Sequence, residues 1–98
     1  MNLRNKYFDV LHSKALVNIG KTRITSEGLI NHISKMLKKE KILKIHALKS
    51  ALAEIEIKDL AELVKNKTNS FLLDVRGHTF IISKYDIKKK YSPKNSII

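Results

Sequence analysis

Gly20, Lys21 and Thr22 are the residue types that end a nucleotide phosphate-binding loop, in which backbone N–H groups and a lysine surround phosphates. The full pattern, G-x-x-x-x-G-K-[ST], requires another glycine at position 15, where this sequence has alanine. Residues 16–19 read Leu-Val-Asn-Ile, which favours a strand over a flexible loop. The chain of 98 residues is also too short for the sheet and magnesium-binding aspartate of a nucleotide hydrolase. The stretch therefore does not predict nucleotide hydrolysis.

A loop that holds the backbone of a nucleic acid requires fewer features. Gly20 permits close approach of backbone N–H groups to phosphate, and Lys21 and Arg23 can reach phosphate oxygens. Thr25 is expected to cap the helix that follows, and the N-terminus of a helix attracts anions. Residues 20–23 therefore predict a backbone-binding loop at a helix N-terminus.

Outside this loop, the sequence shows no pattern typical of catalysis or metal binding. The four histidines are His12, His32, His46 and His78. No two of them are four residues apart, and none has a carboxylate at the spacing of metal ligands. The absence of cysteine excludes disulfides and thiolate metal sites. Four acidic residues are predicted to form a solvated helix surface: Glu54, Glu56, Asp59 and Glu62. We therefore expect no enzyme activity, no cofactor, no metal and no small-molecule substrate.

The charge of the chain favours a polyanionic partner. Lysine and arginine number 20 against nine acidic residues, which gives a formal net charge of +11. Four of the nine acids fall within residues 54–62, so the remainder of the chain is strongly basic. An uneven distribution of this kind indicates one acidic face and one basic face, although a lysine-rich surface can also serve solubility alone.

The apolar periodicity predicts an α/β fold of the two-layer α+β kind, with the order α-β-α-β-α-β-β and a mixed four-stranded sheet. Three helices are expected: one at about 3–13, a second that begins after Thr25, and a third at about 51–67 with Ser50 as its cap. At the start of the second helix, Ile24 and Leu29 would form a hydrophobic staple. Strands are expected at 15–19, 42–48, 71–76 and 79–83, and alternation places His46 on the more exposed face of its strand. Gly77-His78 would form a two-residue hairpin loop.

The chain is expected to form one small domain over residues 1–85, followed by a basic tail over residues 86–98. The tail combines lysines with Tyr91, a composition that suits backbone neutralisation and base stacking as well as a solubilising tail. The longest apolar runs are only a few residues and no secretion signal is evident, so a cytoplasmic protein without a membrane span is expected.

The order of these motifs resembles the YhbY/CRM family of RNA-binding domains. "LVNIGKTRIT" followed by "LINHISKMLKKEKILKIHAL" is similar to the family's apolar strand, G-x-x-G loop, amphipathic helix and "L-K-V" strand, and "FLLDVRGHTFIIS" resembles its closing hairpin. The likeness covers about residues 3–85. The sequence departs from the pattern where Arg23 replaces the second loop glycine and where one extra residue lies between the loop and the helix.

This resemblance implies a fold like that of the C-terminal domain of translation initiation factor three, RNA binding, and association with ribosomal particles or intron RNA. We expect ribosomal RNA as the partner, with ribosomal proteins as neighbours, for an assembly factor or a bound ribosomal component. The alternative is a small basic chromatin-type DNA-binding protein. The expected binding residues are Gly20, Lys21, Thr22, Arg23, Lys14, Arg76, Lys84, Lys88, Lys89 and Lys90. Lys35 and Lys39 would join them if the second helix turns that face to the RNA.

Overall fold

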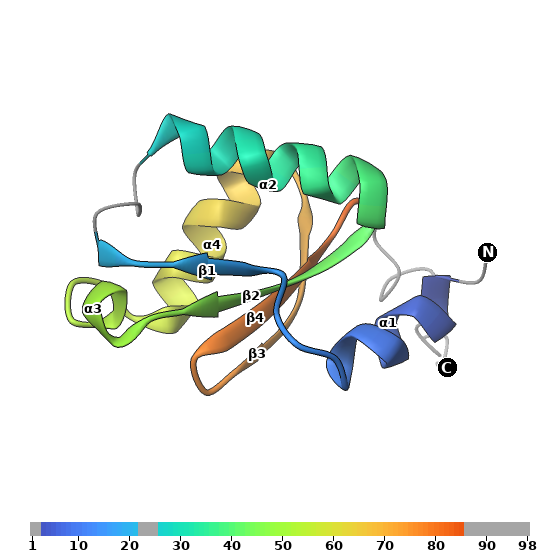
Figure 1. Cartoon of the computed structure of the whole chain (residues 1–98), viewed down its shortest axis with the longest axis horizontal. Helices are drawn as coiled ribbons and strands as arrows, with labels where there is room; N and C mark the ends of the chain where they lie inside the picture. Colours follow the sequence, from blue (N-terminus) through green and yellow to red (C-terminus); the bar gives the residue numbers. More distant parts are fainter. Residues whose placement is uncertain (1–2, 22–25, 86–98) are drawn as a thin grey trace, which may run out of the picture.

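The computed structural model describes residues 3–21 and 26–85 (Figure 1). Its helices and strands, in chain order, are α1 (Leu3–Leu11), β1 (Val17–Ile19), α2 (Glu27–Glu40), β2 (Ile42–Ala47), α3 (Lys49–Leu52), α4 (Ile57–Thr68), β3 (Phe71–Arg76) and β4 (Thr79–Ser83). The strands form a four-stranded sheet in the order β1-β2-β4-β3. β1 pairs with β2 in parallel, whereas β2 with β4 and β3 with β4 are antiparallel. The predicted α+β class and mixed sheet are confirmed.

One face of the sheet is fully covered by helices. Alternate residues of the strands, among them Ile19, Ile45 and Phe80, point into the main core. Side chains of α2, α3 and α4 complete this core. α2 contributes Leu29, Ile33 and Leu37, an i, i+4, i+8 stripe, so its opposite stripe faces solvent. Burial of this apolar area is the main force that holds the domain together.

The other face of the sheet is covered over part of its area by α1. Val10 of α1 packs on Ile42, Leu73 and Ile81, which point away from the main core because the side chains of a strand alternate between faces. The amine of Lys44 donates hydrogen bonds to the carbonyls of residue 11 (3.1 Å) and residue 13 (3.0 Å). Lys44 thereby satisfies carbonyls at the C-terminus of α1 and fixes the helix to the sheet.

α2 begins one residue later than the sequence suggests. Ser26 is its N-cap, and the Ser26 hydroxyl accepts a hydrogen bond from the backbone N–H of Leu29 at 3.3 Å. The prediction of Thr25 as the cap is therefore wrong, because a serine directly after it offers the same chemistry one position closer to the helix. This shift places Leu29 at the third helical position, and Ile24 and Thr25 lie outside the described residues.

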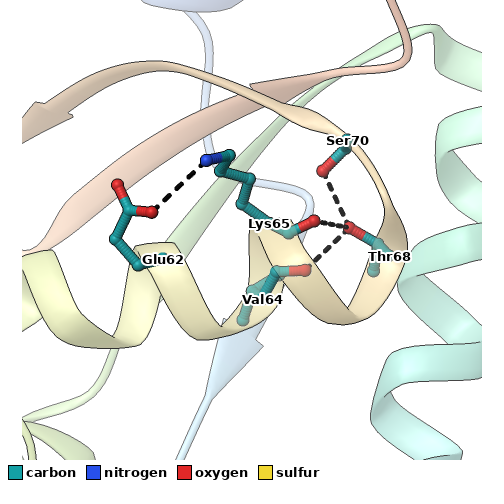
Figure 2. Close-up of polar contacts among 5 residues, drawn as sticks. All are labelled: Glu62, Val64, Lys65, Thr68 and Ser70. Atoms are coloured by element: carbon teal, nitrogen blue, oxygen red, sulfur yellow. Dashed lines mark hydrogen bonds and ion pairs between the residues drawn. The ribbon is translucent and has the colours of Figure 1, made fainter.

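The third predicted helix is two helices, α3 and α4, separated by residues 53–56. Ser50 does not cap either of them: it lies inside α3, whose N-cap is Leu48. At the C-terminal end of α4, the capping residue Asn69 has a left-handed backbone conformation (φ 54°), which asparagine tolerates better than most residues. Figure 2 shows the polar contacts at this end, where the Thr68 hydroxyl donates to the carbonyl of Val64 (2.7 Å) and lies 2.7 Å from the Ser70 hydroxyl.

The closing hairpin has the predicted bounds, with β3 and β4 joined by Gly77 and His78. Gly77 has a φ of +53°, the left-handed conformation that such a short turn requires. One irregularity lies between Leu72 and Asp74, where Leu73 is an extra residue in β3. No helix within the described residues is long and apolar enough to cross a membrane.

Replacement of Lys44 by methionine should lower the free energy of unfolding by about 1–2 kcal/mol, because the carbonyls at the C-terminus of α1 would lose their charged partner. Urea unfolding followed by circular dichroism measures this change. Lys58→Met, on the exposed surface of α4, is the matched control and should have little effect. Equal stabilities of the two variants would show that Lys44 does not anchor α1.

Candidate nucleic-acid interface

The predicted loop leaves the sheet at the C-terminal end of the edge strand β1. Gly20 directly follows β1, and the backbone N–H of Lys21 donates a hydrogen bond to the Ser50 hydroxyl of α3 at 3.2 Å. A Cβ atom added to Gly20 would lie 3.5 Å from the Leu48 side chain and 3.7 Å from that hydroxyl, which are ordinary contacts. The fold therefore does not require glycine at position 20. Thr22 and Arg23 lie outside the described residues.

The first acidic residue of the predicted cluster lies beside the loop. The Lys21 ammonium is 3.6 Å from a carboxylate oxygen of Glu54, which lies in the segment between α3 and α4. Both side chains are more than half exposed, so the ion pair is weak and does not fix Lys21 in place. The sequence pattern separated an acidic face from a basic face, whereas the fold brings one carboxylate to the predicted binding lysine.

The exposed stripe of α2 runs away from the loop along the outside of the domain. Its side chains are Asn31, His32, Lys35, Lys38 and Lys39, all of them exposed. None of these lysines forms an ion pair with an acidic side chain of residues 3–21 or 26–85. At 1.5 Å per residue, the 14 residues of α2 span about 20 Å. We call these five residues the α2 stripe.

The structure does not gather all the predicted binding residues in one place. Arg76 lies at the same end of the sheet as Gly20 and Lys21, because the pairings Ile19–Ala47 and His46–Thr79–Arg76 align these strand ends. Lys84 lies at the opposite end, where its backbone N–H bonds to the carbonyl of Lys41 after α2. Lys14 is exposed in the connection between α1 and β1. Lys88, Lys89 and Lys90, with the predicted tail, lie outside the described residues.

Comparison with known proteins identifies the family. The family model for the CRS1 / YhbY (CRM) domain matches residues 3–84, which is nearly the whole described chain. This chain belongs to the CRS1/YhbY (CRM) domain family. The predicted resemblance is thereby confirmed, and the match includes both the loop and the closing hairpin. A search of curated proteins finds no match.

The CRM fold is supported by a solved structure with little sequence similarity. The solution structure of the hypothetical protein SAV1595 from Staphylococcus aureus, which is described there as a candidate RNA-binding protein, has a TM-score of 0.62 to this chain. The two sequences are 23% identical, and the match covers 85% of this chain and 83% of the other. At this identity the likeness establishes the fold.

This CRM domain has no group of three or more histidine, cysteine or acidic side chains in its described residues that could hold a metal ion. The four histidines come from separate elements, and His46 makes a hydrogen bond to Asn18 (3.2 Å) rather than to a carboxylate. His46 is half-buried on the face opposite Ile45 and Ala47, as alternation predicts.

Sequence reasoning missed two contacts of the CRM loop. Ser50 carries the signal of a helix cap, but its hydroxyl accepts from the loop backbone instead. Glu54 carries the signal of a solvated helix residue, but it pairs with Lys21. Both contacts join segments about 30 residues apart, so no local pattern could have indicated them.

Replacement of Gly20 by alanine should leave the stability of the domain within about 0.5 kcal/mol, because the added methyl group meets only ordinary contacts. RNA affinity should fall roughly tenfold if phosphate approaches the backbone at this position, since the methyl group occupies that space. Fluorescence anisotropy with a structured RNA measures affinity, and urea unfolding measures stability. Unchanged affinity would remove Gly20 from the interface.

Replacement of Glu54 by glutamine should increase RNA affinity roughly two- to fivefold, because it removes a carboxylate that competes with phosphate for Lys21. Glu62→Gln makes the same change in net charge but breaks an ion pair with Lys65 on α4. Binding measured at equal salt concentration should therefore improve more for the first variant. Equal improvement of both would mean that net charge alone, and not the loop, sets the affinity.

Proposed function

We propose that this CRM domain binds ribosomal RNA through residues 20–23 and the α2 stripe, as a factor in ribosome assembly or as a bound ribosomal component. Membership of the CRM family supports RNA binding. The observation that carries the proposal is the exposed α2 stripe, whose lysines lie in the second half of the helix that follows the loop.

The geometry suits contact with a phosphate backbone. The positive end of the α2 dipole favours anions at one end of the interface. Lys35 and Lys39 extend from the same side of the helix one turn apart, so both can approach phosphates of one strand. Because double-stranded RNA hides its base edges in a narrow groove, contacts of this kind read the shape of the backbone rather than its sequence.

The charge of the molecule supports a large polyanion over a small ligand. The exposed lysines of α2 lie between residues 35 and 39, about 6 Å of the helix, and they belong to a chain with a formal net charge of +11, which suits a large polyanion. Binding of this type releases counterions and therefore weakens as salt rises. The family resemblance favours ribosomal RNA as the polyanion. Duplex DNA, the partner in the chromatin-type alternative, would bind to the same positive charges.

The double variant Lys35→Gln/Lys39→Gln should weaken binding to a structured ribosomal RNA fragment and reduce its salt dependence by about one unit of slope per lost phosphate contact. The matched control, Lys58→Gln/Lys67→Gln, makes the same charge change on the exposed surface of α4. Titrations at several salt concentrations measure both effects. Equal slopes for the two variants would exclude the α2 stripe.

The ribosomal part of this expectation is tested by sedimentation of a native lysate on sucrose gradients, with the same pair of variants. The wild type and the α4 control should migrate with a ribosomal subunit or its precursors at low salt, and the α2 variant should not. Retention at high salt would assign a bound component, and loss at high salt an assembly factor. Migration with DNA would reject ribosomal RNA as the partner.

A further inference from the structure

A row of polar side chains crosses all four strands on the part of the sheet that α1 leaves open. The register pairs each member with the next across the sheet: Asn18 with His46, His46 with Thr79, and Thr79 with Arg76. The residues beside them in each strand, such as Ile45 and Phe80, point into the main core, so the row points to the opposite face. We call these four residues the sheet row.

α1 borders the sheet row without covering it: Leu11, its last residue, lines a small cavity with Arg76 and Thr79. Its packing partners on this face are Ile42, Leu73 and Ile81, which lie toward the other end of the strands. Asn18 and Arg76 are exposed, and His46 and Thr79 are half-buried. Neighbouring strands are about 4.8 Å apart, so three strand intervals give the row a length of about 14 Å.

The side chains of the row are held by contacts that leave their functional groups accessible. His46 Nδ1 lies 3.2 Å from Asn18 Oδ1, which leaves the amide nitrogen of Asn18 as a donor. Arg76 Nε contacts Asp74 at 2.9 Å, while 77% of the Arg76 side chain is exposed, so the carboxylate orients a guanidinium whose outer nitrogens face solvent. The exposed ring of His78 lies beside His46, with their centroids 6.4 Å apart.

The sheet row is continuous with the proposed backbone-binding loop. Asn18 lies in β1, and Gly20 follows it by two residues, a distance of about 7 Å along an extended chain. Gly20 and Lys21, the β3–β4 turn and the row all lie at the same end of the sheet. A strand of RNA whose backbone is held at Gly20 can therefore continue directly onto the row.

We propose that the sheet row, together with His78, binds two or three unpaired nucleotides of an RNA whose backbone is held by the loop. This inference rests on the proposed function and specifies the kind of RNA. A polar sheet surface that carries flat rings and an arginine is suited to unpaired bases, because bases stack on histidine rings and guanidinium planes. Arg76 also pairs with phosphate, and the Asn18 amide donates to a base edge or a ribose oxygen.

The test uses the full-length protein and two RNA probes: a blunt 16-base-pair duplex of two strands, and the same duplex with a five-nucleotide single-stranded 3′ extension. The wild type should bind the extended duplex roughly tenfold more tightly. His78→Ala/Arg76→Gln should reduce this ratio toward one, whereas its affinity for the blunt duplex should fall only by the factor that the loss of one positive charge produces. Both residues are exposed, so the variant is expected to fold, and its melting temperature verifies this.

His12→Ala/Lys67→Gln replaces a histidine and a cationic side chain outside the row, with the same change in charge, and should keep the wild-type ratio. The Lys35→Gln/Lys39→Gln variant should weaken both probes equally, which separates the row from the α2 stripe. A wild-type ratio of one, or a ratio that survives His78→Ala/Arg76→Gln, would overturn the assignment while RNA binding itself stands. Failure of the wild type to bind either probe would instead reject the proposed function.

Discussion

The parallel pairing of β1 with β2 determines where the proposed interface lies. Two parallel strands cannot be joined by a tight turn, so the chain must cross the sheet and return, and α2 provides that crossover. The crossover places residues 20–23 between the end of β1 and the start of α2, where the first backbone N–H groups of a helix have no partner within the helix. It also requires α2 to bury one stripe on the sheet, which leaves the opposite stripe, with its lysines, in solvent.

The two faces of the sheet differ in how completely helices cover them. The face under α2 and α4 is closed by apolar side chains. The other face carries a short helix, α1, which covers Ile42 and Ile81 and ends where the amine of Lys44 holds its last carbonyls. Nine residues of helix cannot cover four strands. At the end of the strands beyond α1, this face carries the polar side chains of the sheet row.

Much of the fold could be predicted from the sequence because its signals are local. The strands Phe71–Arg76 and Thr79–Ser83 were predicted at their observed bounds, since alternation and Gly77 specify a hairpin within thirteen residues. The break between α3 and α4 was not predictable, because residues 53–56 contain neither glycine nor proline and Ile55 fits a helical stripe. Of the site, Gly20 and Lys21 could be selected by residue type, but the sheet row depends on register between strands that are far apart in the sequence.

The short length of β1 has a consequence for the dynamics of the domain. β1 is an edge strand that pairs through three residues, whereas β2 and β4 pair through five. A short edge strand opens with a lower free energy than global unfolding, so its amide protons should exchange with solvent before those of β2. The loop is therefore attached to a strand that we expect to separate from the sheet at a lower free energy than β2 or β4. A ligand that binds the loop and requires β1 in place would stabilise that strand through mass action, and this couples occupancy of the interface to the local stability of the sheet edge.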